Sequence, residues 1–258
     1  PAPGDPDDDD DDEDDDDDDD DYAFDRASGE CFVSHGFELP DTLLDAYRIV
    51  RHTGPLARSL HDPLREYADS LGYPRDFTIY DTPDSQSAMK ACIKELGLDE
   101  KLYKPKEMLG RISKEKNDLV TPADYKADPD KTMADLRSRK PKVCDIFALY
   151  VNKCKQNGVM DFDDILLNMH RLLKENKAAL EDISGRFSYI LVDEYQDTNY
   201  AQYAILKQLC CRHHNICVVG DDSQSIYAFR GARPNIMLNS QKDFPDAKVI
   251  FMETNYRS

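Results

Sequence analysis

The fold is decided by SYILVDEYQDTN, residues 188–199, and ICVVGDDSQSIYAFRGA, residues 216–232. Each stretch runs from a short apolar strand directly into acidic and amide side chains. Those that follow the strands are Asp193, Glu194, Gly220, Asp221 and Gln224. The carboxyl ends of neighbouring parallel strands meet at one edge of a sheet, where open α/β sheets bind their ligands. The two stretches therefore predict the ligand-binding edge of a sheet that hydrolyses a nucleotide.

The flanking sequence predicts that this sheet is parallel. Strand patterns at 189–192, 216–219 and 249–252 alternate with helix patterns at about 199–211 and 234–241, and strands separated by helices are typical of parallel sheets.

The sequence before residue 188 is mostly helical in pattern. Residues 39–71 indicate helix and loop, with Leu43, Leu44, Tyr47 and Val50 on one face. A short strand is expected at 77–80, and helices are expected from Thr82, around Met108–Ile112, over 143–154 and from about Ile165. The last of these follows the acidic stretch 160–164, whose charges favour a helix N-terminus. Residues 121–142 lack clear periodicity and predict an exposed connecting stretch.

The charge of the chain lies mainly at its start. Of the formal net charge of −19, 16 negative charges belong to Asp5 and the run 7–21. So long a block of like charges is expected to be disordered, and residues 1–30 are assigned to this acidic tail. Two interpretations stay open, a solvated tail and a docking arm for a basic protein partner or a decoy for a DNA-binding groove.

Cysteine usage and hydropathy limit the class of protein. The seven cysteines form no C-x-x-C pair, which indicates reduced thiols and an intracellular location, with nucleus or organelle undecided. Cys210, Cys211, His213 and His214 do not have zinc-site spacing, and a helix end with Cys210 in the core is the favoured interpretation. No apolar run approaches the roughly 20 residues of a membrane span.

The acidic pair after the first strand has a specific chemical interpretation. In Mg-nucleotide sites, one strand-end carboxylate orients the metal, commonly through water, and the next polarises the attacking water. Asp193 and Glu194 match these positions, although two acids at a strand end are also typical of solvated carboxylates. The phosphate-binding pattern G-x-x-x-x-G-K-[ST] is missing, because no Gly-Lys dipeptide occurs in the 258 residues.

Three strings in a fixed order add specificity: VDEYQDTN, VVGDDSQSIYAFRGA and METNYRS. They resemble the Walker B motif, motif III and the start of motif IV of the UvrD/Rep/PcrA-like family of superfamily 1 helicases. The resemblance extends to LREYADSLGYPRDFTIYDTPDS, KLYKPKEMLGRISKEKNDLVTPADY and GVMDFDDILL, and so covers about residues 64–258. Members of this family use ATP to move 3′ to 5′ along single-stranded DNA.

The resemblance implies roles for individual residues around ATP and Mg²⁺. Asp193 would serve Mg²⁺ through water, Glu194 would be the catalytic base, and Gln224 would contact the γ-phosphate. Arg257 would reach the same phosphate as a bidentate donor, and Tyr256 would stack on adenine.

The same resemblance implies a contact with single-stranded or duplex DNA. Tyr227 and Phe229 would stack on bases, with Arg230 beside them, whereas spacing alone would place both aromatic side chains in a core. Ala228 stands where the family usually has Arg and Ser223 where Asp or Ala is common, and the loss of that Arg would weaken a local contact.

The fold class predicted is α/β, a RecA-like parallel sheet of the P-loop NTPase type, incomplete, with an inserted all-helical subdomain. Residues 31–63 are unassigned, 64–160 would be the helical subdomain with flanking elements, and 161–258 would be part of the motor domain. The chain is expected to be part of an ATP-dependent 3′–5′ DNA helicase that acts in repair or replication. This polypeptide alone is expected to be inactive because the phosphate-binding loop is missing; the second motor domain expected after Ser258 is also missing. The alternative is a degenerate, non-catalytic module that binds DNA or protein; QSIYAFRGA speaks against an unrelated DEAD-box ATPase.

Overall fold

A computed structural model describes residues 49–50, 53–220, 244 and 247–248. All of them belong to one compact unit, Val33–Ser258. The acidic tail, the expected helix at 234–241 and the expected strand at 249–252 lie outside the described residues. Among the residues that are described, no helix is both long and apolar enough to cross a membrane.

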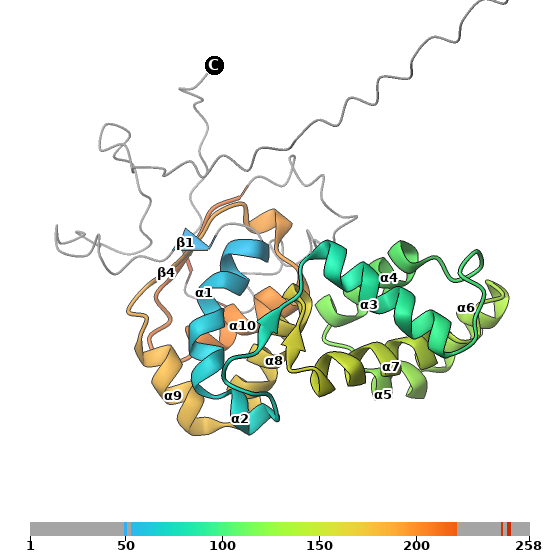
Figure 1. The fold of residues 1–258 in the computed structure, drawn as a ribbon. Coiled ribbons are helices and arrows are strands. Elements are labelled where there is room, and N and C mark those ends of the chain that lie inside the picture. The colour runs from blue at the N-terminus through green and yellow to red at the C-terminus, as the bar shows by residue number, and fades with distance from the viewer. Residues whose placement is uncertain (1–48, 51–52, 221–243, 245–246, 249–258) are drawn as a thin grey trace, which may run out of the picture. The chain divides into compact units, whose positions relative to one another are not determined.

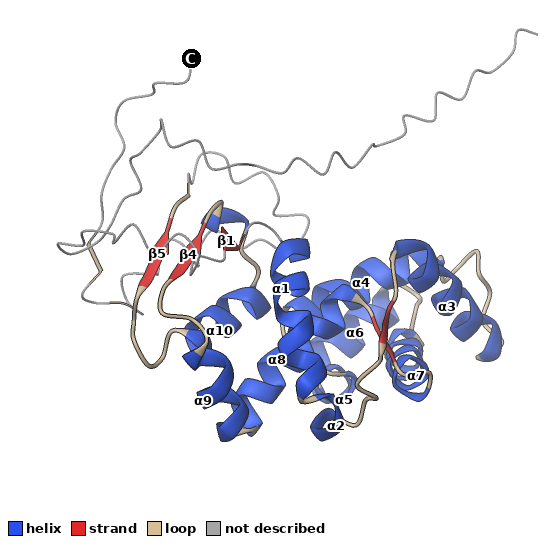
Figure 2. Ribbon diagram, turned by 60° about the vertical axis from the view of Figure 1, so that its left-hand side comes forward, coloured by secondary structure: helices blue, strands red, loops and turns tan. Residues whose placement is uncertain are grey.

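A three-stranded parallel sheet carries the DEYQDTN stretch. Strand β4 (Ile190–Val192) lies between β1 (Ile49–Val50) and β5 (Ile216–Val218), and Figure 2 shows the three strands side by side. Ile190 pairs with Ile216, and Leu191 pairs with both Ile49 and Cys217. The expected parallel pairing of the two apolar stretches is therefore present.

One expectation about this sheet was wrong. Val50 was placed on a helix face with Leu43, Leu44 and Tyr47, but it lies in β1 and pairs with Val192. The β-branched Ile49–Val50 pair suits a pleated strand, and a two-residue strand is too short to show alternation. The other three residues of that face lie outside the described residues.

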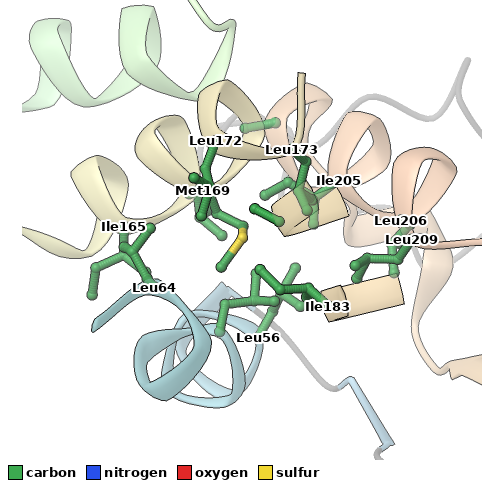
Figure 3. Packing of buried hydrophobic residues seen from close by; sticks show 14 of the residues in the cluster. Leu56, Leu64, Ile165, Met169, Leu172, Leu173, Ile183, Ile205, Leu206 and Leu209 are labelled. Atoms are coloured by element: carbon green, nitrogen blue, oxygen red, sulfur yellow. The ribbon is translucent and has the colours of Figure 1, made fainter. Parts of the chain in front are cut away.

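One group of helices packs with this sheet around a shared apolar core. These helices are α1 (Thr53–Glu66), α2 (Ala68–Leu71), α8 (Phe162–Glu175), α9 (Lys177–Gly185) and α10 (Tyr200–Leu209). Their buried side chains form one cluster with Ile190 and Val192 of β4. Figure 3 shows how Leu56 and Leu64 of α1 meet the apolar side chains of α8, α9 and α10. The stripe predicted from Ile165 to Leu173 is fully buried in this core.

A second group of helices lies around a separate apolar cluster. Its buried apolar side chains come from α3 (Thr82–Glu95), α4 (Pro105–Asn117), α5 (Pro122–Ala127) and α7 (Val143–Gln156). The short α6 (Pro129–Arg137) joins the group through its buried Asp135, which accepts from the hydroxyl of Tyr125 at 2.9 Å. The chain enters this group through β2 (Thr78–Ile79) and leaves it through β3 (Val159–Met160), and these two strands pair in parallel. Figure 1 shows the five helices gathered beyond this strand pair.

The stretch 121–142 is largely exposed, as expected, but it is not an irregular connection, because α5 and α6 occupy most of it. Thr121 and Asp124 form a reciprocal capping box at the start of α5, and Asp128 accepts from the amides of Asp130 and Lys131 at the start of α6. Each helix buries a single side chain, Tyr125 or Asp135. Helices this short, with one buried residue each, leave no apolar periodicity to detect.

Candidate functional site: the acidic end of strand β4

The strand ends of β4 and β5 are joined by backbone hydrogen bonds beyond the paired residues. The amide of Val219 donates to the carbonyl of Val192 at 2.8 Å, and the amide of Tyr195 donates to the carbonyl of Val219 at 2.8 Å. The chain after β5 therefore lies against the loop after β4. At Gly220 an added Cβ would lie 2.6 Å from Gln196 Oε1 and 3.2 Å from the backbone nitrogens of Tyr195 and Gln196. Only glycine fits this close approach without displacing the loop.

Glu194 has an unusual backbone conformation at this edge. Its φ of 50° and ψ of 44° are left-handed, a region that costs a residue with a Cβ about 1–2 kcal/mol. The amide of Glu194 donates to Asp193 Oδ1 at 2.9 Å, and Gln196 Nε2 donates to Glu194 Oε2 at 2.6 Å. The amide of Asp197 donates to the carbonyl of Glu194, which begins the short 3-10 helix Tyr195–Asp197. Strain held by such a set of bonds is typical of functional sites.

The loop ends at the N-terminus of helix α10. Asn199 caps this helix: its side chain accepts from the amide of Gln202 at 2.9 Å, and Gln202 Oε1 accepts from the amide of Asn199 at 2.9 Å. Both side chains are buried. The positive end of the helix dipole therefore lies next to the acidic loop, where it favours negative charge.

A small hollow opens beside the two acids. It is lined by Val192, Asp193, Glu194, Asp197, Thr198, Gln202 and Leu206. The polar lining consists of carboxylate, hydroxyl and amide groups, and such oxygen donors are the ligands that Mg²⁺ prefers. Among the described residues, however, no three Asp, Glu, His or Cys side chains are placed to hold an ion directly, so any Mg²⁺ here would have to be held largely through water.

The structure brings together only some of the predicted site residues. Asp193 and Glu194 lie side by side, partly buried, immediately after β4. The other predicted site residues lie outside the described residues: Gln224, Tyr227, Phe229, Arg230, Tyr256 and Arg257. Their approach to the acidic pair stays a prediction.

The cluster at the end of α10 has the arrangement of a helix end. Cys210 is buried and caps α10, whereas Cys211 is exposed. Within the described residues no three His, Cys, Asp or Glu side chains are placed to hold a metal ion.

Sequence reasoning missed an ion cluster at the N-terminus of α8. The acidic stretch there does cap the helix, since Asp161 Oδ1 accepts from the amide of Asp164 at 2.7 Å. The same two carboxylates also hold the buried Lys116 of α4, at 2.7 Å and 2.8 Å from its Nζ. The signal was available as three aspartates in an otherwise apolar helix start, with a lysine at the end of an earlier amphipathic helix.

The cluster perturbs the protonation of its carboxyl groups. Burial, reinforced by the charge of Asp161, raises the pKa of Asp164 to about 7 and that of Asp163 to about 6. The pKa of Asp161 is lowered: burial opposes its ionisation, but the charge and hydrogen bond of Lys116 outweigh burial. The attraction of these carboxylates likewise overcomes burial and raises the pKa of Lys116.

Comparison with known proteins identifies the family. Residues 59–245 match the model of the UvrD/REP helicase N-terminal domain. The chain is 42% identical over 195 residues to the ATP-dependent DNA helicase PcrA of Staphylococcus aureus (strain Mu50) and 43% identical to that of Bacillus subtilis (strain 168). Each match covers 76% of this chain and 26% of the relative, so the chain spans about a quarter of the length of these proteins. The chain therefore belongs to the UvrD/REP helicase N-terminal domain family.

Proposed function

We propose that this chain is part of an ATP-dependent DNA helicase that moves 3′ to 5′ on single-stranded DNA during repair or replication. The observation that carries the proposal is the acidic pair Asp193–Glu194 at the end of β4, with Glu194 in a left-handed conformation and Gly220 packed against the following residues, Tyr195 and Gln196. The relatives that are 42% and 43% identical to this chain over 195 residues are named ATP-dependent DNA helicase PcrA.

The proposed architecture is a RecA-like parallel sheet with an inserted helical subdomain. Three parallel strands with the acidic loop at their carboxyl edge support the first part. The second part is supported by the helix group α3–α7, which is entered and left through the paired strands β2 and β3 and in which α3, α4, α5 and α7 share an apolar core of their own. We infer that residues 64–160 contain the inserted subdomain and residues 161–258 the motor part.

The residues of the loop would divide the chemistry between them. Glu194 would accept a proton from the attacking water, and its bond from Gln196 Nε2 at 2.6 Å would hold the carboxylate in place. Asp193 would hold Mg²⁺ through water, and bound Mg²⁺ would supply charge neutralisation at the phosphates. Gln224 and Arg257 would contact the γ-phosphate, and Tyr256 would stack on adenine. Tyr227, Phe229 and Arg230 would contact DNA.

The experiment that tests this function is a substitution of the proposed base in the protein made from the complete reading frame. We expect Glu194→Gln to lower the DNA-stimulated ATP hydrolysis rate by a factor of about 100 or more, because general-base catalysis typically contributes 10²–10⁴. ATP binding, measured with a fluorescent analogue, should stay close to wild type, since the amide keeps the size and hydrogen-bonding capacity of the side chain. An unchanged hydrolysis rate would exclude Glu194 as the base.

The matched control is Glu175→Gln, because Glu175 is a solvent-exposed carboxylate of α8 whose partner is Arg171 at 3.0 Å. Its loss should leave hydrolysis unchanged. A similar loss in both variants would mean that the assay reports general damage to the protein.

A further inference from the structure

The C-terminal end of helix α4 is fastened to helix α8 by a buried lysine. Lys116 is 0% exposed, and its Nζ lies 2.7 Å from Asp161 Oδ2 and 2.8 Å from Asp164 Oδ1. The hydroxyl of Tyr150 donates to the same Asp161 oxygen at 3.0 Å. Replacing buried ion pairs by apolar side chains is often neutral or stabilising. The cluster is therefore better explained by the definite geometry that it imposes between two helices than by a large gain in stability.

The next residue, Asn117, extends this contact to a third helix. Asn117 Nδ2 donates to Asp163 Oδ1 of α8 at 3.2 Å, and Asn117 Oδ1 accepts from Asn199 Nδ2 at 2.9 Å. Asn117 and Asn199 are 5% and 2% exposed. Because hydrogen bonds between buried amides are directional and costly to leave unmade, this chain of groups sets the position of Asn199.

Asn199 is the last residue of the acidic loop. Its Oδ1 caps α10 while its Nδ2 reaches α4, so one side chain serves both purposes. The loop from Asp193 to Asn199 is therefore held near its start by the bond between Tyr195 and Val219 and at its end by Asn117. Because the loop has only seven residues, the position of Asn199 bears on the backbone that carries the two acids.

We propose that Asn117, held in place by Lys116 and Asp163, is a positioning residue for the acidic pair: it ties α4 to the start of α10 and thereby sets the geometry of Asp193 and Glu194. This inference rests on the proposed function, which gives Asp193 and Glu194 their roles in ATP hydrolysis. The position of the helices α3–α7 would in this way be relayed to the hydrolysis site through Asn117 and Asn199.

The polarity of the chain of hydrogen bonds allows a sharp test. In Asn199→Asp the side chain still caps α10, but it sets a carboxylate oxygen against Asn117 Oδ1. Adding Asp163→Asn reverses the polarity: Asn117 can flip its amide, donate to the carboxylate at 199 and accept from the amide at 163. The hydroxyl of Ser113, 3.4 Å from Asn117 Nδ2, can donate as well as accept and so permits the flip.

The measurement is amide hydrogen exchange of the 258-residue chain, which needs no nucleotide. We expect Asn199→Asp to speed the exchange of the amides of residues 195–198 by about tenfold, the effect of one lost buried hydrogen bond. The amide of Gln202 should stay protected, because the cap is retained. The double variant Asp163→Asn/Asn199→Asp should restore exchange to within about threefold of wild type, and Asp163→Asn alone should change little.

The matched control is Asn176→Asp, which makes the same change at the cap of α9, where the side chain accepts from the amide of Ala179 of its own helix. It should leave residues 195–198 unchanged. Unchanged exchange in Asn199→Asp, or no recovery in the double variant, would overturn the inference. If Asn199→Asp alone does not fold, the double variant still tests the inference. Recovery of folding and of native exchange in the double variant would support it, and no recovery would overturn it.

Kinetics of the complete protein separate this inference from the proposed function. Asn199→Asp should lower kcat for ATP by about tenfold with a small effect on KM, because misplacement affects the transition state more than binding, and the double variant should recover. If the exchange results hold but the wild-type complete protein hydrolyses no ATP, the proposed function fails while the positioning of the loop stands. If hydrolysis is normal in Asn199→Asp, the inference about positioning fails and the proposed function stands.

Discussion

Glu194 combines a strained backbone with a fixed carboxylate, and Gly220 is the neighbour that makes this arrangement possible. Gln196 Oε1 occupies the space that a Cβ at residue 220 would need, while Gln196 Nε2 holds Glu194. The side chain of Gln196 cannot move away without releasing the proposed base. The conformation of one catalytic candidate thus depends on the absence of a side chain at Gly220, just beyond β5.

For single residues, we predict opposite effects of two Gly→Ala substitutions on the stability of the chain. Gly220→Ala should destabilise the chain by about 1–3 kcal/mol, as overpacking does, and should loosen Glu194. Gly110→Ala, in the exposed middle of α4 with no atom within 4 Å of the added Cβ, should stabilise the chain by about 0.5–1 kcal/mol. Urea unfolding measures both. Equal effects would contradict the close packing at Gly220.

The acidic pair itself was predictable because it follows an apolar strand in the sequence. The burial of Lys116 was not predictable, since a lysine is expected on a solvent-exposed helix face, and its carboxylate partners are 45 residues or more away. The partnership of Asn117 with Asn199, 82 residues apart, likewise left no local signal. Contacts that depend on the packing of distant helices emerge only from the fold.

At the scale of elements, the junction between α4 and α8 should make stability depend on pH. Asp164, with a pKa of about 7, and Asp163, with a pKa of about 6, keep protons in the folded chain that unfolded carboxyls release near their ordinary value of 3.8. Their contribution to stability is therefore present below about pH 4 and is lost as pH rises towards 7. Asp161, whose pKa is lowered, contributes in the opposite sense, since its stabilisation is lost as pH falls.

The variant Asp164→Asn isolates the first effect. Its unfolding free energy relative to wild type should increase steadily between pH 4 and pH 7, because only the wild type must give up the proton at residue 164. Chemical denaturation at several pH values measures the difference. The control is Asp76→Asn, which changes an exposed carboxylate. Its unfolding free energy should differ from that of wild type by the same amount at every pH. A constant difference for Asp164→Asn would show that the pKa of Asp164 is not raised.

The helices that sequence patterns predicted are those with long buried stripes or clear starts. Asp81 caps α3, with Asp81 Oδ1 accepting from the amide of Asp84 at 2.8 Å, and Gly158 follows the end of α7 with a φ of 63°. Both signals are local. The short α5 and α6 and the two-residue strands β1 and β3 were missed because they are stabilised by capping or pairing rather than by periodicity. Helix α9 was also missed, although it buries Ala179 and Ile183 one turn apart in the core.

At the scale of the whole molecule, the chain holds one part of a proposed nucleotide site. The 258 residues contain no Gly-Lys dipeptide, and thus no loop of the usual type for cradling phosphates. Phosphoryl transfer relies on positioning and charge neutralisation. We predict that the isolated polypeptide releases no phosphate from ATP above background in the presence of single-stranded DNA. Robust turnover in a colorimetric phosphate assay would contradict the view that these 258 residues hold only part of the nucleotide site.

We propose that Asp193, Glu194, Gln224 and Arg257 surround one triphosphate. A crystal structure of the complete protein with Mg²⁺ and a non-hydrolysable ATP analogue tests it most directly. We predict that the γ-phosphate lies beside Glu194 at the end of β4, with Gln224 and Arg257 in hydrogen-bonding contact with it. A nucleotide bound away from β4, or these four side chains spread over separate faces, would contradict the account.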